Sequence, residues 1–173
     1  MVEAAHQPAR GIRESSYLFV FLFATWLVLT SSFHPQELLT GAVVSVVLTG
    51  FLRKTYAKLG LPPFSLRRAW YFGVYLLVLL KEIVRANLDV AYRVIHPRLP
   101  IRPGIVAVHT DLRQDIAKMV LANSITLTPG TFTLDILGDT LLIHWIDVRS
   151  EDAEEAARLI SGRFEKYLRE IFA

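Results

Sequence analysis

The sequence predicts a membrane α-helical hairpin followed by a third helix and a small cytoplasmic α/β domain of order β-α-β-β-α. Hydrophobic residues make up 53% of the 173 positions, against about 45–50% in a typical soluble domain. They are concentrated in two long segments of the first half, whereas the second half alternates short β-rich and amphipathic segments. We expect the hairpin in residues 1–60, the third hydrophobic or amphipathic helix in 61–96 and the α/β domain in 97–173.

Two hydrophobic segments separated by a helix-breaking turn predict the hairpin. The segments are Tyr17–Phe33 and Leu38–Leu52. Pro35 between them lacks a backbone donor and disfavours helix at His34. Each segment reaches the ~20 residues of a membrane span only when its polar shoulders are included. The sequence therefore predicts a tight pair of short membrane helices.

Small residues recur every four positions along the second segment, at Gly41, Ser45 and Thr49. Small side chains let helix backbones approach closely in lipid. The pattern predicts that this helix packs against a neighbouring helix, and the first segment is one candidate for that neighbour.

Basic residues flank the hairpin on both outer sides and are absent from its turn. Arg10 and Arg13 precede the first segment. The basic residues that follow the second segment are Arg53, Lys54, Lys58, Arg67 and Arg68. Because positive residues favour the cytoplasmic side, both ends of the hairpin are expected there. The segment after Leu29 is a poor cleavage site for a signal peptide, so a retained anchor is expected.

A third apolar stretch, Ala69–Leu80, runs into charged residues from Lys81 onward. So short a run is more typical of an interfacial helix than of a span. A full span would also carry Arg93 and Arg98 outside, against the charge rule. We expect a long helix at the cytoplasmic surface or only partly inserted, and a third full span is the alternative.

Prolines and glycines divide the remaining sequence into the elements of the α/β domain. Pro97, Pro100 and Pro103 end the third helix. The expected strands are Ile105–His109, Thr131–Leu137 and Thr140–Val148, with Gly138 and Asp139 as the hairpin turn between the last two.

Two amphipathic helices complete this domain. Thr110 is expected to cap the first, and Ser150 the second. The apolar stripe of the first helix is Leu112, Ile116, Met119 and Val120. The buried stripe of the second is Ala157, Ile160, Phe164, Leu168 and Ile171.

Residues 122–131 form a dense run of hydroxyl side chains with one proline and one glycine. Its informative members are Ser124, Thr126, Thr128, Pro129, Gly130 and Thr131. Pro129 fixes its own φ, Gly130 can adopt a positive φ, and the threonines can bond nearby backbone. We expect a turn from the first helix to the hairpin, with Gly130 in a conformation that a Cβ disfavours. A docking surface for partner subunits is the alternative.

Catalytic and ligand-binding patterns are absent from this sequence. It has no cysteine, so disulfides and thiolate metal sites are excluded. Parts of a hydrolytic triad occur at Ser124, His109, His144, Asp111 and Asp135, but without a recognisable nucleophile motif. Neither a metal-binding spacing nor a phosphate loop nor a nucleic-acid motif is present. We therefore expect no enzyme activity, cofactor, metal, nucleic-acid partner or small-molecule substrate.

The hairpin also lacks the residues of an ion path. Transported ions and protons need ionisable groups at membrane depth. Neither Tyr17–Phe33 nor Leu38–Leu52 contains an Asp, Glu, Lys, Arg or His. Only Lys81 and Glu82 approach the apolar zone of the third helix. The chain is not expected to conduct ions by itself.

Three segments carry a resemblance to a known family. They are Lys81–Asn87, Pro100–Ile105 with its Arg102-Pro103-Gly104 block, and Ser124–Thr131. In this order they resemble the E subunit of the multisubunit Mrp-type sodium/proton antiporter, from about Arg68 to the end of the chain.

The resemblance implies an accessory subunit, needed for assembly and stability, of an antiporter complex in the plasma membrane. Its partners would be other membrane subunits and the lipid bilayer, and the large subunits would carry the ion chemistry. The corresponding subunit of a membrane-bound hydrogenase-type complex is an alternative identity. A membrane-anchored enzyme with a site around residues 122–131 and a free-standing adaptor are the rival functions.

Overall fold

The computed structural model describes residues 8–58, 62, 65–150 and 152–173. The chain forms two compact units, Met1–Pro63 and Phe64–Ala173. The start of the expected third segment at Leu61 and the residue Glu151 lie outside the described residues.

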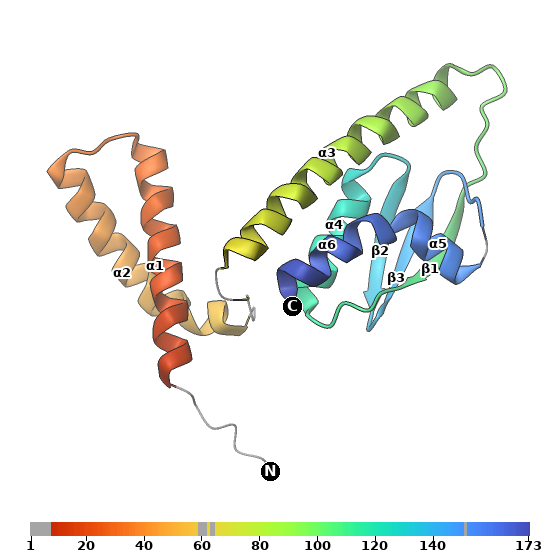
Figure 1. The fold of residues 1–173 in the computed structure, drawn as a ribbon. Coiled ribbons are helices and arrows are strands. Elements are labelled where there is room, and N and C mark those ends of the chain that lie inside the picture. The colour runs from red at the N-terminus through yellow and green to blue at the C-terminus, as the bar shows by residue number, and fades with distance from the viewer. Residues whose placement is uncertain (1–7, 59–61, 63–64, 151) are drawn as a thin grey trace, which may run out of the picture. The chain divides into compact units, whose positions relative to one another are not determined.

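The first unit is a helical hairpin of α1 (Pro8–Thr30) and α2 (Pro35–Lys58) (Figure 1). Pro35 begins α2, where its missing N–H would have had no helical partner. In the turn, Ser31 adopts a φ of 48°. α1 begins before the expected apolar segment but ends at Thr30, short of Phe33, because the chain turns at Ser31. α2 extends beyond its apolar segment at both ends, which lengthens it toward a membrane span.

The small-residue pattern of α2 faces α1. Gly41, Ser45 and Thr49 are all buried, which confirms the predicted close packing and identifies the first segment as the neighbour. A Cβ on Gly41 would overlap the indole ring of Trp26. The Trp26 indole N–H also donates to the Glu37 carbonyl at 3.1 Å, so shape and one hydrogen bond fix the pair near the turn.

Length and composition support a membrane span for one of the two hairpin helices. Among the described residues, Pro35–Tyr56 is long and apolar enough to cross a membrane, whereas the apolar helix Ser15–Thr30 is shorter.

The second unit contains α3 and a three-stranded antiparallel sheet with helices. α3 (Leu66–Ile95) is one unbroken helix of 30 residues, so it is about 45 Å long. The other elements are β1 (Gly104–His109), α4 (Asp115–Leu127), β2 (Thr131–Leu137), β3 (Thr140–Trp145), α5 (Ala153–Ile160) and α6 (Gly162–Phe172). The sheet order is β1-β3-β2.

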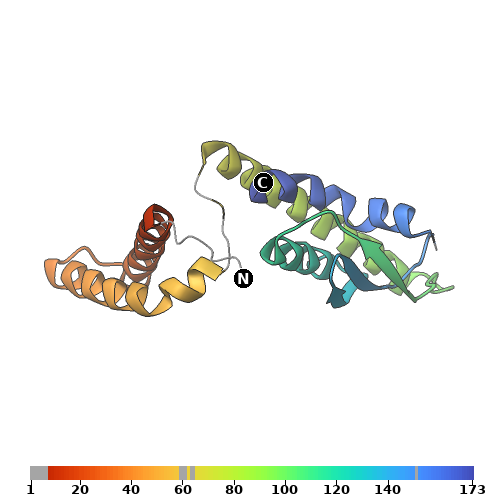
Figure 2. The same ribbon diagram turned by 90° about the horizontal axis from the view of Figure 1, so that it is seen from below.

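One core joins the sheet, α4, α6 and α3. Its fully buried residues include Val108, Leu121, Ile125, Leu141, Ile143, Phe164 and Leu168. Tyr75 of α3 belongs to the same core, and α3 runs beside α6 (Figure 2). The third helix is thus a part of this unit.

The two predicted turns adopt the expected conformations. Gly130, between α4 and β2, has a φ of 94°. Gly138 has a φ of 62° and is the first of two residues joining β2 to β3, as a type II′ turn requires.

The start and phase of the domain's first helix were predicted wrongly. α4 begins at Asp115, not after Thr110. The Thr110 hydroxyl donates to Glu165 of α6 at 3.0 Å and accepts from the Leu112 N–H at 3.3 Å, so it bonds a turn that precedes the helix. Of the expected stripe, Leu112 is buried ahead of the helix and Val120 packs against the core, but Met119 is 53% exposed. The apolar residues that α4 buries are Ala117, Leu121, Ala122 and Ile125.

The last helix was expected to be continuous but is split into α5 and α6 at Ser161. The Ser161 hydroxyl donates to the Ala157 carbonyl at 2.9 Å, next to Gly162 with its low helix propensity. Asp152 is the N-cap, not Ser150, and accepts from the Glu155 N–H at 2.8 Å. The expected buried stripe holds for Ile160, Phe164, Leu168 and Ile171, whereas Ala156 is buried in place of Ala157.

Candidate functional site

The two motif blocks of the sequence flank the same end of β3. The Ile146 N–H donates to the Gly130 carbonyl at 2.9 Å, and the Arg102 N–H donates to the Ile146 carbonyl at 3.0 Å. The Val148 N–H donates back to the Arg102 carbonyl at 2.9 Å. We call the region of Arg102, Gly130, Ile146 and Asp147 the motif junction.

Glycine allows close approach in both blocks. A Cβ on Gly104 would lie 2.8 Å from Cγ2 of Val148. A Cβ on Gly130 would lie 3.0 Å from Cγ2 of Ile146 and 3.6 Å from Cγ2 of Val90 in α3. The turn at Gly130 therefore fits between the end of β3 and α3, and Pro103 and Pro129 each precede one of these glycines.

The threonines of the turn bond the end of α4. The hydroxyls of Thr128 and Thr131 each donate to the Ile125 carbonyl at 2.7 Å. This carbonyl belongs to the last turn of the helix, where the N–H four residues on is not available, and its backbone partner is the Thr128 N–H at 3.2 Å. The hydroxyls thus close the end of α4 and shape the turn.

Ser124 and Thr126 connect α4 to its neighbours. The buried Ser124 hydroxyl is hydrogen-bonded to the Tyr75 hydroxyl of α3 and donates to the Val120 carbonyl at 2.6 Å. The Thr126 hydroxyl accepts from the Thr133 N–H of β2 at 3.2 Å. All six residues predicted in this run therefore lie at contacts within the unit or in the turn itself.

The parts of a hydrolytic triad do not assemble around Ser124. Its two partners in the described part of the chain are Tyr75 and a backbone carbonyl. His109 and His144 are exposed on the strands. No group of three or more His, Asp and Glu that could hold a metal occurs among the residues described.

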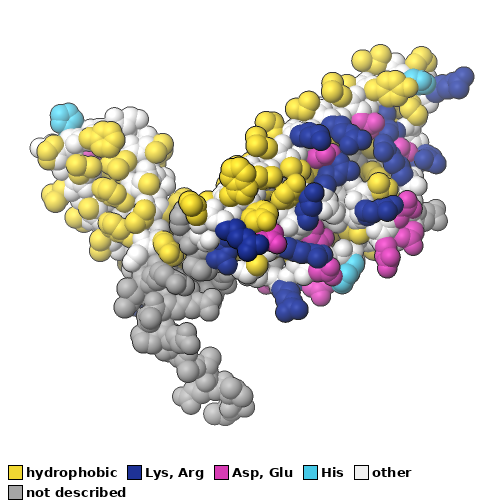
Figure 3. Space-filling model, in the orientation of Figure 1, with side chains coloured by type: hydrophobic (Ala, Val, Ile, Leu, Met, Phe, Trp, Pro, Cys, Tyr) yellow, Lys and Arg dark blue, Asp and Glu magenta, His cyan; other side chains and the backbone are white. Residues whose placement is uncertain are grey.

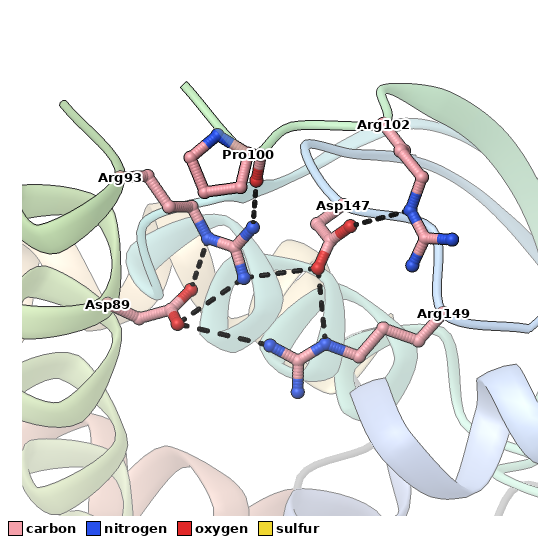
Figure 4. Close-up of polar contacts among 6 residues, drawn as sticks. All are labelled: Asp89, Arg93, Pro100, Arg102, Asp147 and Arg149. Carbon is pink, nitrogen blue, oxygen red and sulfur yellow. Dashed lines mark hydrogen bonds and ion pairs between the residues drawn. The ribbon is translucent and has the colours of Figure 1, made fainter. Parts of the chain in front are cut away.

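An ion-pair network ties α3 to the motif junction (Figure 4). Arg93 of α3 is only 8% exposed. Its guanidinium lies 2.8 Å from the Asp89 carboxylate and 3.1 Å from that of Asp147, and it donates to the Pro100 carbonyl. Arg102 lies 3.2 Å from the other oxygen of Asp147.

Arg149 completes the network more loosely, at 3.5 Å from Asp147 and 3.9 Å from Asp89. Burial by itself would raise the pKa of Asp147, but the Arg102 hydrogen bond and the Arg93 charge outweigh it and hold that pKa below its ordinary value. The hydrogen bond to Asp89 raises the pKa of Arg93. Both groups are therefore charged at neutral pH.

Sequence reasoning missed Arg93, Asp147, Lys118 and Glu165. Lys118 of α4 donates to the Asp139 carboxylate at 2.7 Å, and Glu165 accepts from the Asp111 N–H at 2.8 Å. The sequence does mark such residues, because a charged residue stands at a position where the apolar pattern predicts burial; Lys118 on the inner face of α4 is an example. The partners of these residues lie far away in the sequence, so the signal does not identify the contacts.

The chain matches the model of the family described as Na+/H+ ion antiporter subunit over residues 19–171. It belongs to this family. The residues that match this antiporter subunit family include most of the hairpin. The sequence motifs that resemble the family, in contrast, begin only at α3.

Curated relatives carry the same family name. The Na(+)/H(+) antiporter E subunit of Bacillus subtilis (strain 168) is 35% identical over 156 residues, which cover 89% of this chain and 95% of the relative. The corresponding protein of Alkalihalophilus pseudofirmus is 34% identical over 148 residues, covering 84% and 90%. The resemblance to the antiporter E subunit is thereby confirmed.

A solved structure is similar in both sequence and fold. It is a chain of the membrane-bound sulfane sulfur reductase, an archaeal respiratory membrane complex. The chain is 48% identical to it with a TM-score of 0.82, covering 92% of this chain and 99% of the other. A chain of this fold therefore occurs in a respiratory membrane complex too.

Proposed function

We propose that the chain is an accessory, non-catalytic membrane subunit of a multisubunit cation (sodium)/proton antiporter, acting in assembly and stability. The observation that carries the proposal is the family match over residues 19–171. The contacts of the motif residues support a structural role, because the hydroxyls of Thr128 and Thr131 bond the backbone of their own unit.

The hairpin would contribute by packing against lipid and the helices of other subunits. Large apolar side chains cover its outside, including Phe21, Val28, Leu29, Val43 and Phe51. Apolar surface of this extent is typical of membrane contact. We extend the proposal to the predicted divisions, with residues 1–60 in the membrane, 61–96 at its surface and 97–173 bracing a cytoplasmic face.

We place α3 in the plane of the membrane surface. Arg67 near its start pairs with Glu170 at 2.7 Å, and Arg93 near its end pairs with Asp147. A helix bound along its length to a polar domain would have to carry that domain into the bilayer if it spanned.

The face of α3 away from the domain is apolar. Its exposed residues include Leu66, Trp70, Leu77, Leu80, Val84, Leu88 and Ile95. Figure 3 shows hydrophobic side chains following the helix, with charged side chains between it and the rest of the unit. Such a division is typical of a helix in the interface.

A respiratory complex is the second candidate assembly. It is favoured by the 48% identity to a chain of the sulfane sulfur reductase, which exceeds the 35% identity to the Bacillus subtilis antiporter subunit. The role of the chain would be the same in either complex.

Deletion of the chain in its host tests the function. We expect loss of sodium-dependent proton movement in membrane vesicles, together with loss of the intact complex on native gels, and recovery of both on re-expression. Co-purified redox subunits would identify the respiratory complex. Sodium-driven proton movement by the purified chain alone in liposomes would contradict the proposal.

The cytoplasmic placement is testable with single cysteines, because the chain contains none. Glu154→Cys lies at the exposed start of α5 and His34→Cys in the exposed hairpin turn. In intact cells a membrane-impermeant maleimide should label the turn and spare α5. Equal labelling of both would contradict the orientation.

A further inference from the structure

A pocket of about 160 Å³ opens between α3, the turn after α4, and α5 and α6. Three arginines line it: Arg85 of α3, Arg149 after β3 and Arg163 at the start of α6. Thr128 and Pro129 of the turn form another part of the wall. Such a volume holds a phosphate-sized group or several water molecules.

The arginines of the pocket are unequally neutralised. Arg163 pairs with Glu82, and Arg149 makes only the two long contacts to Asp147 and Asp89 in the described part of the chain. Arg85 is exposed and forms no ion pair with any residue that the structure describes. Its charge is therefore available to a ligand.

Positive charge also prevails in the wider neighbourhood. The arginines of the pocket and the adjoining network are Arg85, Arg93, Arg102, Arg149 and Arg163, and the acids are Glu82, Asp89 and Asp147. Five positive charges against three negative ones leave a net +2. Figure 3 shows basic side chains gathered beside the hydrophobic surface of α3.

We propose that this pocket binds a phosphate group, and that the phosphate belongs to an anionic phospholipid whose acyl chains lie on the apolar face of α3. Guanidinium groups bind phosphate oxygens through paired, charge-assisted hydrogen bonds. Val84 and Leu88, each adjacent in sequence to a pocket residue, are 53% and 67% exposed. A basic pocket bordering apolar helix surface matches an amphiphile better than a free anion.

This inference rests on the proposed position of α3 at the membrane surface. The lipid would connect α3, the turn at Pro129 and α6 through one headgroup. It would also give the turn a contact beyond its own unit, because Thr128 borders both the end of α4 and the pocket.

Lipid retention by the full-length chain in detergent tests the proposal. Native mass spectrometry after addition of phosphatidylglycerol or phosphatidylcholine should show preferential retention of phosphatidylglycerol. Arg85→Gln and Arg149→Gln should each weaken that retention about tenfold, as expected for loss of one charged hydrogen-bonding group. Arg113→Gln is the matched control, since Arg113 is exposed, lies outside the pocket and has no ion pair among the described residues.

Two further arms separate the lipid from a free phosphate. Leu88→Gln should weaken phosphatidylglycerol retention without changing the binding of inorganic phosphate measured by calorimetry. Phosphate binding that depends on Arg85, without any preference for phosphatidylglycerol, would overturn the lipid assignment. Equal retention by the Arg85 and Arg113 variants would overturn the site.

The same preparations distinguish this failure from failure of the proposed function. A chain that joins its complex but shows no preference for phosphatidylglycerol refutes the pocket alone. A chain that retains phosphatidylglycerol through Arg85 but joins no complex refutes the accessory role alone.

Discussion

The α1–α2 hairpin and α3 both expose apolar side chains on one face, but they differ in the side chains through which the opposite, buried face packs. The hairpin packs through small uncharged groups, with Gly41 against Trp26 and Ser45 buried. α3 packs through charge as well as through the apolar core around Tyr75, with Glu82 paired to Arg163 and Arg93 paired to Asp147. Under the proposed placement of α3 at the membrane surface, the partners of the buried face, and not hydropathy alone, distinguish a surface helix from a spanning helix.

The largest effect is expected at the charged side of α3. Arg93→Met would remove the shared buried partner of Asp147 and Asp89. Because Arg102 and Arg149 still contact Asp147, the cost should be about 3 kcal/mol of unfolding free energy, the lower end of the range for a broken buried pair. Thermal unfolding of the full chain in detergent measures the loss.

Arg98→Met is the control, because Arg98 is exposed in the following segment. Equal unfolding temperatures for the two variants would mean that the network does not hold α3 to the domain.

A smaller effect on stability is expected at the uncharged contact between α1 and α2. Gly41→Val would force its side chain into Trp26, and overpacking of this kind costs about 1–3 kcal/mol. Gly50→Val provides the control, since a Cβ there meets nothing within 4 Å. Thermal melts in detergent should separate the two variants, and identical melts would refute the glycine contact.

The motif turn should respond more modestly still. Gly130→Ala would place a Cβ at a φ of 94° and 3.0 Å from Cγ2 of Ile146, costing about 1 kcal/mol or more through strain. Gly73→Ala in α3 has open space around its Cβ and should be neutral or stabilising.

Melting and assembly assays on these two variants separate a structural turn from a docking surface. Unchanged melting with weakened assembly of the Gly130 variant would favour docking. If the Gly130 variant shows both unchanged melting and unchanged assembly, the turn has neither a structural role nor a docking role.

Sequence patterns predicted the features that depend on local chemistry. Apolar segments predicted the hairpin, four-residue spacing predicted the face of Gly41, and turn chemistry predicted the positive φ of Gly130. Prediction failed where a distant side chain decides the outcome. Thr110 does not cap α4, and Glu165, 55 positions later, accepts from both the Thr110 hydroxyl and the Asp111 N–H in the segment before the helix. The convergence of Arg102 and Gly130 on Ile146 depends on the sheet order.

The smallest effect is a pH dependence. Because the folded pKa of Asp147 is lowered, its stabilisation is complete above the ordinary carboxyl pKa of about 3.9 and is lost as the pH falls through the folded value. Asp147→Asn should therefore be less stable near neutral pH and lose less stability on acidification than the wild type. Parallel acid dependences, measured by unfolding across this pH range, would contradict a charged Asp147.

The depth of α3 in the bilayer is the measurement that tests its placement at the membrane surface most directly. Single spin-labelled cysteines at Leu66, Leu77, Leu88 and Ile95, all exposed on α3, can be compared with one at Val46 of α2 in reconstituted membranes. We predict similar shallow depths along the whole of α3 and a deeper label at Val46. Depths that rise to a maximum near Leu77 and fall again toward both ends would show that α3 spans the membrane and would contradict this placement.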